Sequence, residues 1–368
     1  MSFERFNIEN MQGYTPGEQP GGGDIIKLNT NENPFPASAE VATSLKAIQI
    51  DSLRTYPPSL ADSFRATAAR LHQVSPANII PTNGGDELLR LAITTFVDTD
   101  DTIAITQPSY SLYPVLANVQ ACNLVEIPLH TDWTMPDDFC SQLEAAGAKM
   151  VILVNPHAPT GSLLSTDYLA QLAKEFSGVL VVDEAYVDFI DPAIGYNSVP
   201  LINSQDNILI LRTLSKGYSL AGLRFGYGIG AESLVYPMLY KTRDAYNTDF
   251  ISQQLATAAL NSIDYAKQNW QKIRLTRTRL IASLNELGLP TLPSQSNFVL
   301  CQIPDAIGAE NLYQLLKQRH ILVRYFDQDR LRDKLRISVG TDKDIAVLVA
   351  ALKEILAREA EILEEQIS

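Results

Sequence analysis

Short apolar runs alternate with amphipathic segments over much of the first two thirds of the chain. Helical periodicity is clear at 60–72 and at 166–176. Because buried parallel strands need helices on both faces of their sheet, this alternation predicts an α/β fold with a mainly parallel central sheet in a large domain. The apolar runs that we interpret as its strands are 102–106, 124–129, 149–156, 178–186 and 207–213.

A different pattern begins near residue 250. A long helical region is followed by strand-like runs at 297–303, 321–326 and 335–340 and by a terminal helix, which predicts a smaller α+β domain. Residues 12–36 are rich in Pro, Gly and Asn and are predicted to be extended. The predicted division is an N-terminal arm at 1–30 that packs with the small domain, a large domain at 31–255 and a small domain at 256–368.

Composition narrows the classes of ligand. The 368 residues carry a formal net charge of −13, so nucleic acid is not an expected partner, and an anionic ligand must be held by a few focused groups. The three cysteines and four histidines show no metal-binding spacing, so no metal is expected. Gly21–Gly23 lacks the G-K-[ST] of a phosphate loop and is predicted to be a turn. The polar N-terminus and the lack of long apolar runs favour a cytoplasmic protein without a membrane contact.

Three polar residues stand at the ends of predicted strands: Asn155, Asp183 and Lys216. Ligands of parallel sheets bind outside the carboxyl ends of the strands, so we expect these residues to be neighbours. A buried Asp183 needs a partner, which is either a structural ion pair or cap or a cationic ligand atom such as a protonated ring nitrogen. Lys216 is either a solvated lysine or a chemical group, and Tyr186 could offer its phenol to the same ligand.

Residues 84–86 (Gly-Gly-Asp) open a predicted helix, where free N–H groups form either an anion cradle or an ordinary glycine turn. Ser215 and Arg224 flank Lys216 and could complete a phosphate site. Tyr110 could stack on a planar ring or simply pack. A phosphate cradle, a carboxylate for a ring nitrogen, a phenol, an aromatic ring and a lysine together describe the binding site of pyridoxal 5'-phosphate.

The sequence also resembles a known family over about residues 12–345. The motifs RTLSKGYSLAGLRFGYGIG, VVDEAY, NGGDELL, PSYSLY and APTG resemble the pyridoxal-phosphate-dependent aminotransferases of fold type I. The segments GYTPG, LNTNENP, RTYP, VRYF and LRISVG resemble, within that fold type, the histidinol-phosphate aminotransferase family.

The resemblance assigns roles to the residues around the cofactor ring. Lys216 would form a Schiff base with the cofactor and later move the proton of the substrate. Asp183 would pair with the pyridine nitrogen, Tyr186 would hydrogen-bond the ring oxygen, and Tyr110 would stack on the ring. The family usually has an asparagine at the position of Ala158, so either Tyr186 suffices here or a neighbour takes over, for which Asn155 and His157 are the candidates.

The resemblance also implies binding sites for the two acidic groups. The phosphate of the cofactor would be held by Gly85, Asp86, Ser215 and Arg224. Tyr56 would reach the phosphate of the other subunit, which makes the expected assembly a homodimer with a shared active site. The acidic end of the substrate would be bound by Tyr14, Arg324 and Arg336.

The activity implied is transfer of an amino group between L-histidinol phosphate and 2-oxoglutarate, giving imidazole acetol phosphate and glutamate, in histidine biosynthesis. Two other activities stay open: an aromatic amino-acid aminotransferase, and a pyridoxal-phosphate-dependent decarboxylase of a phosphorylated amino acid such as threonine phosphate. A regulator that binds the cofactor would need an appended DNA-binding domain, which this acidic chain is not expected to carry.

Overall fold

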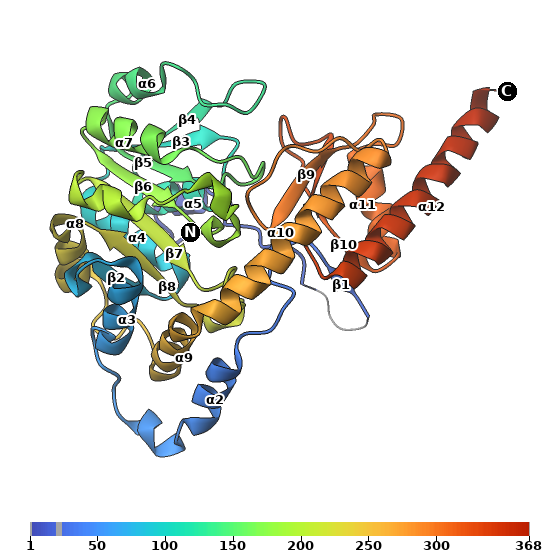
Figure 1. Ribbon diagram of the computed structural model, residues 1–368. Helices are drawn as coiled ribbons and strands as arrows, with labels where there is room; N and C mark the ends of the chain where they lie inside the picture. The colour runs from blue at the N-terminus through green and yellow to red at the C-terminus, as the bar shows by residue number, and fades with distance from the viewer. Residues whose placement is uncertain (1, 20–23, 368) are drawn as a thin grey trace.

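A mostly parallel sheet forms the centre of the larger part of the protein. The structure, a computed structural model, describes residues 2–19 and 24–367, so the turn predicted at 21–23 lies outside it. Strands β3 to β7 run parallel to one another, and β8 is antiparallel to both of its neighbours, which confirms the predicted α/β fold (Figure 1). In spatial order the strands of this sheet are β2 (Ile79–Thr82), β8 (Gly226–Gly230), β7 (Ile208–Thr213), β6 (Val179–Asp183), β5 (Ala148–Val154), β3 (Thr102–Gln107) and β4 (Asn123–Pro128).

Both faces of this sheet are buried against helices. Successive strand residues point to opposite sides, so each strand contributes to two apolar cores. In β6, Val181 joins one apolar core, while Leu180 and Val182 join the other. The first core is closed by α4 (Gly84–Phe96), α5 (Leu112–Gln120) and α8 (Glu232–Pro237). Helices that contribute to the second core include α3 (Asp62–His72), α6 (Phe139–Ala145), α7 (Thr166–Glu175) and α9 (Phe250–Asn261).

A smaller α+β region lies beside the large sheet, and α10 (Ile263–Glu286) runs across to it (Figure 1). Its antiparallel sheet has the order β11 (Arg324–Tyr325), β12 (Lys334–Ser338) and β9 (Phe298–Gln302). The helices α11 (Ala309–Gln318) and α12 (Asp342–Ile367) complete the region. In the part of the chain that the structure describes, none of the helices has both the length and the apolar character needed to cross a membrane.

The N-terminal segment reaches both regions. Residues of β1 (Ile26–Lys27) pair in parallel with β10 (Ile321–Leu322), while α1 (Phe6–Glu9) contacts α5. The helix α2 (Ala39–Ala47) packs on α9. The domain limits at residues 30 and 255 stay a prediction, and α9 runs across the second of them.

The sequence pattern did not predict β2 and β8. The strand β2 contains Pro81, and β8 reads GYGIG, so both have low intrinsic strand propensity. Close packing explains the glycines: a Cβ on Gly228 would come within 2.8 Å of Ile80 and 2.9 Å of Leu88. Tertiary packing against α4 therefore overrides local propensity in this part of the sheet.

Candidate active site

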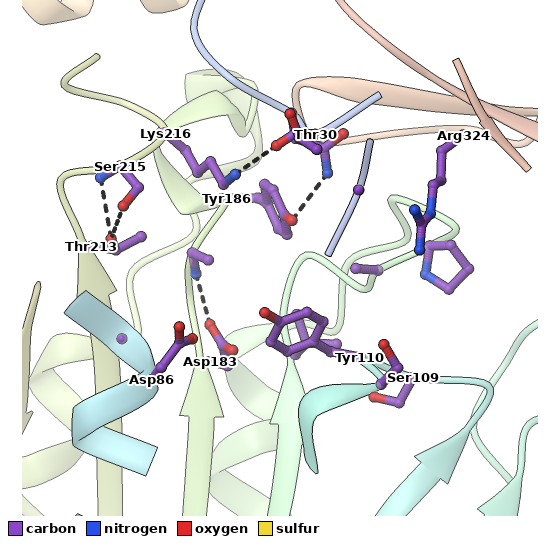
Figure 2. Close-up of a pocket in the computed structure, with 18 of the residues that line it drawn as sticks. Thr30, Asp86, Ser109, Tyr110, Asp183, Tyr186, Thr213, Ser215, Lys216 and Arg324 are labelled. Atoms are coloured by element: carbon purple, nitrogen blue, oxygen red, sulfur yellow. Dashed lines mark hydrogen bonds between the residues drawn. The ribbon is translucent and has the colours of Figure 1, made fainter. Parts of the chain in front are cut away.

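A cavity of about 260 Å3 lies at the carboxyl ends of the parallel strands, where side chains from β11 and β12 also face it (Figure 2). The cavity therefore lies where the strand-end rule predicts a ligand site. Tyr56 does not line the cavity, and neither does Asn155, which was expected to lie beside Asp183 and Lys216. The predicted site residues that do line it are Tyr14, Gly85, Asp86, Tyr110, Asp183, Tyr186, Ser215, Lys216, Arg224, Arg324 and Arg336.

Lys216 follows the end of β7 by three residues and extends into the cavity. Its Nζ donates a hydrogen bond to the backbone carbonyl of Thr30 at 2.8 Å. Burial and the nearby Arg336 lower the pKa of Lys216 to about 8, although Glu32 opposes the shift. About a tenth of the lysine is then neutral at pH 7, against roughly three in ten thousand for an ordinary lysine. The amine is therefore available as a nucleophile and as a base.

Asp183 is the last residue of β6 and is only 5 % exposed. Burial raises the pKa of Asp183 to about 6, while hydrogen bonds from Tyr113 and from the backbone N–H of Ala185 oppose the rise. Those two bonds measure 2.8 Å and 3.1 Å. A carboxylate held this way is ready to pair with a cationic group that enters the cavity.

Tyr113 is a residue that the sequence reasoning missed. Its side chain is fully buried in α5, and its hydroxyl donates to Oδ2 of Asp183. Tyr113 lies in the first turn of α5, three residues after Tyr110, which precedes the helix. A buried tyrosine also needs a hydrogen-bond partner. In an apolar helix, however, such a residue is more simply interpreted as core.

An anion cradle forms on one side of the cavity. The first N–H groups of α4 have no partner within the helix, and the hydroxyl of Ser215 lies beside them on the cavity wall. Arg224 completes the cradle, with its guanidinium 3.3 Å from Oδ2 of Asp86. Gly84 has a φ of +76°, and a Cβ there would come within 2.7 Å of the Arg224 guanidinium. Only glycine allows this approach.

Aromatic side chains shape the middle of the cavity. The ring of Tyr110 meets those of Tyr14 and Tyr113 edge-on, with centroid distances of 5.7 Å and 5.5 Å. The Tyr186 ring packs edge-on against Phe298 at 5.0 Å. Between the cradle and the arginines, these rings leave a space in which a flat ligand can lie.

Two arginines lie on the side of the cavity opposite the anion cradle. Arg324 and Arg336 are directly opposite each other on the antiparallel strands β11 and β12, where like charges destabilise a sheet. The Arg336 guanidinium lies between the rings of Phe298 and Phe326, and its Nε is buried without a hydrogen-bond partner. Within the described residues neither arginine forms an ion pair, so both are available to an anion. Figure 2 places Arg324 across the cavity from Asp86 and Ser215.

Neither Asn155 nor His157 supplies a substitute for the asparagine that is usual at position 158. Asn155 directs its side chain to Leu164 and Tyr196, so the expectation that it joins Asp183 and Lys216 in the site is wrong for its side chain. Both ring nitrogens of His157 are engaged, with Thr160 and with the carbonyl of Pro108. Burial lowers the pKa of His157 to about 4, so the ring is neutral and structural.

Tyr56 lies on the surface of the single chain. It is 80 % exposed, and its ring stacks on Tyr246 at 4.5 Å. Its assigned role in the other subunit stays a prediction.

The cavity fits a flat, cationic ring that carries a phosphate. The cradle suits the phosphate, Asp183 suits a protonated ring nitrogen, and Lys216 is positioned to react with an aldehyde. Arg324 and Arg336, which line the cavity and form no ion pair with another described residue, remain for a second anion. These features together define an aminotransferase site of the pyridoxal-phosphate type.

Comparison with known proteins agrees with this class. The family of class I and II aminotransferases matches residues 23–352, and the chain therefore belongs to that family. Among its relatives, the histidinol-phosphate aminotransferase of Microcystis aeruginosa is 42% identical over 350 residues, with 95% of this chain and 97% of the relative covered. That of Rhodopirellula baltica is 41% identical over 339 residues, with 92% and 91% covered.

Solved structures are similar as well. The histidinol-phosphate aminotransferase of Sinorhizobium meliloti in complex with pyridoxal-5'-phosphate superposes with a TM-score of 0.89 at 25% identity, and 97% of this chain and 98% of that chain are covered. The L-threonine-O-3-phosphate decarboxylase of Porphyromonas gingivalis has a TM-score of 0.78 at 20% identity, with 90% of this chain and all of that chain covered, which shows a shared fold alone.

Proposed function

We propose that this chain is a pyridoxal-phosphate-dependent aminotransferase that transfers an amino group between L-histidinol phosphate and 2-oxoglutarate. The observation that carries the proposal is the pair Arg324 and Arg336, which forms no ion pair with any residue that the structure describes and lies across the cavity from a separate anion cradle. A site with two anion subsites suits an acidic substrate beside a phosphorylated cofactor. Relatives with about 40% identity over almost the full chain support the choice of substrate.

When bound, pyridoxal phosphate supplies an aldehyde that takes up the amino group and a ring that draws electrons from the reacting carbon. The N–H groups of Gly85 and Asp86, with Ser215 and Arg224, would hold its phosphate. Asp183 would keep a proton on the ring nitrogen, because an ionised, buried carboxylate stabilises a cation beside it.

Proton transfer at the substrate falls to Lys216. Its pKa of about 8 lies near neutral pH, which is the condition for an efficient general base that must also return the proton. Tyr186 would orient its phenol toward the ring oxygen, and Tyr110 would cover one face of the ring.

Both substrates can use the same arginines. A guanidinium offers planar paired N–H donors that match a phosphate monoester and a carboxylate equally well. Arg336 is held between two aromatic rings, so its orientation is fixed before the substrate arrives. Histidinol phosphate and 2-oxoglutarate can therefore bind in turn at one subsite without a movement of the Arg336 guanidinium.

Replacing Arg336 by glutamine tests the shared subsite. We expect KM to rise by about 30- to 1000-fold for both histidinol phosphate and 2-oxoglutarate, because the acidic group of each substrate loses its cationic partner in a buried site. Steady-state kinetics with each substrate varied in turn measures the change. Arg319→Gln is the matched control: this arginine donates to the carbonyl of Leu315 outside the cavity, and its loss should leave both KM values near wild type. A rise for one substrate only would show separate anion subsites.

A donor panel separates the proposed function from its alternatives. The purified, cofactor-loaded protein should convert histidinol phosphate with 2-oxoglutarate faster than phenylalanine with 2-oxoglutarate. Comparable rates with phenylalanine would favour an aromatic aminotransferase. Release of carbon dioxide from threonine phosphate without consumption of 2-oxoglutarate would favour the decarboxylase.

We further propose a homodimer in which Tyr56 completes the site of the partner subunit. The segment at residues 50–56 follows α2 and projects from the body of the protein (Figure 1). It carries Ile50, 83% exposed, as well as the exposed Tyr56. Exposed apolar side chains on a projecting segment are typical of an interface. The cytoplasmic location stays a prediction from the sequence.

Mixing two inactive variants tests the shared site. Chains with Tyr56→Ala and chains with Lys216→Ala, unfolded together and refolded, should form hybrid dimers with one intact site. Because half of the dimers are hybrid and each has one good site of two, we expect about a quarter of wild-type activity. Activity no higher than that of the separate variants would contradict the shared site.

A further inference from the structure

Asn31 is buried where the N-terminal segment meets the small sheet. It is 1 % exposed and has a φ of +56°, a conformation that asparagine tolerates better than most residues. Its backbone N–H donates to Oγ of Ser338 at 2.9 Å, and its carbonyl accepts from Nδ2 of Asn297 at 2.8 Å. The position of this residue is therefore fixed on both sides by the region that carries Arg336.

The hydrogen bonds also fix which way the amide of Asn31 points. The Ser338 oxygen accepts the backbone N–H of Asn31, so its own proton is free to be donated to Oδ1 of Asn31, at 2.9 Å. The amide nitrogen then faces the cavity and donates to the hydroxyl oxygen of Tyr186 at 3.1 Å. In this contact Tyr186 is the acceptor, so its hydroxyl proton remains available to another partner.

We propose that Asn31 is a positioning residue for Tyr186, holding the phenol so that its proton points to the ring oxygen of the cofactor and making it a stronger donor. The proposal rests on the function proposed above, in which that ring oxygen is the partner of the phenol. Chains of hydrogen bonds polarise one another, so a donor on the phenol oxygen strengthens the bond that the phenol itself donates.

Two features of this chain give the contact its importance. The side chain of Ala158 offers no hydrogen-bond donor, and both Asn155 and His157 are engaged elsewhere, so the bond from the Tyr186 phenol to the ring oxygen gains in importance. Burial raises the pKa of Tyr186, whereas Arg336 and the bond from Asn31 lower it. Both influences that lower the pKa of Tyr186 depend on β12. Arg336 lies on this strand, and Asn31 is hydrogen-bonded to Ser338, which lies two residues after Arg336 on the same face.

The visible absorption band of the cofactor-loaded protein provides the test. Its shift with pH reports a proton near the ring oxygen, and a hydrogen bond from Tyr186 favours the deprotonated form, in which that oxygen carries more negative charge. Asn31→Gly keeps the left-handed backbone and removes the donor. We expect the pH midpoint to rise by about 0.5–1 unit. Asn31→Asp, which is isosteric, serves if the glycine variant folds poorly, and should shift the midpoint in the same direction.

Two comparisons isolate the route through Tyr186. In a Tyr186→Phe background, Asn31→Gly should cause no further shift, because coupled residues show non-additive effects. Asn297→Ala removes a hydrogen bond to the same segment but leaves the Asn31 amide in contact with Tyr186. It should lower Tm and leave the midpoint close to the wild-type value.

The outcomes separate this inference from the proposed function. An unchanged midpoint in both Asn31 variants, or a full shift that persists in the Tyr186→Phe background, would overturn the role of Asn31. If the wild-type protein develops no visible band with pyridoxal phosphate, the proposed function itself fails.

Discussion

Lys216→Ala should lower kcat by about 10⁴-fold or more, because one substitution removes both the nucleophile and the base that moves the proton of the substrate. The structure places this amine in the cavity, with a pKa lowered to about 8 by burial and by Arg336. Stopped assays at high enzyme concentration would measure the residual rate. Borohydride reduction followed by mass spectrometry should find the cofactor attached to residue 216 in the wild type and nowhere in the variant.

Lys267→Ala is the matched control for this loss. Lys267 forms a surface ion pair with Asp264 in α10, and its side chain is 59% exposed. Its removal should leave both turnover and covalent attachment near wild type. Persistent attachment in the Lys216 variant would mean that another lysine is the nucleophile.

Asp183→Asn should lower kcat by about 10²- to 10³-fold, since a fixed charge that stabilises the reacting ring is replaced by a neutral amide. The same change should stabilise the cofactor-free protein. Burial raises the pKa of Asp183 to about 6, so the folded state holds its proton more tightly than the unfolded state does. The free energy of unfolding of the wild type therefore falls as the pH rises from about 4 through 6, and the asparagine variant escapes that loss.

Chemical denaturation of the cofactor-free proteins at several pH values would measure this difference. It should be near zero at pH 4 and reach at most about 3 kcal/mol above pH 6, in favour of the variant. Equal stability at pH 8 would show that the buried carboxylate is not under strain without its partner.

Tyr113→Phe should have a smaller effect on the same carboxylate than Asp183→Asn has. It removes one of the two hydrogen bonds to the carboxylate but keeps the carboxylate itself. The pKa of Asp183 should therefore rise further, and kcat should fall less than in Asp183→Asn. The fall should be greatest at low pH, where more of the carboxylate is protonated.

The sequence was informative wherever function follows strand ends. The carboxyl ends of β6 and β7 placed Asp183 and Lys216 in one cavity, because parallel strands direct their ends to the same edge of a sheet. The same rule failed for the side chain of Asn155. A strand end fixes where a backbone finishes but not to which side its last side chain turns, and that depends on partners such as Leu164 and Tyr196.

Residues that act through contacts distant in the sequence could not be predicted from the sequence. Thr30 and Asn31 meet Lys216 and Tyr186 across more than 150 residues of sequence, and the LNTNENP segment that contains them does not indicate either contact. Tyr113 was missed for a different reason, since an aromatic residue in an apolar helix has the same periodicity whether or not its hydroxyl serves a carboxylate.

The pairing of β1 with β10 has a consequence for the order in which the protein matures. Ile26 cannot pair until Ile321 has been synthesised, and Asn31 cannot form its hydrogen bond until Ser338 has been synthesised, 307 positions later. The ribosome releases the beginning of the chain long before these partners exist, so the large sheet can fold, with α1 against α5, while residues 26–31 still lack their partners in the small region. Catalytic competence therefore arrives last, after translation has reached the final strand of the small sheet.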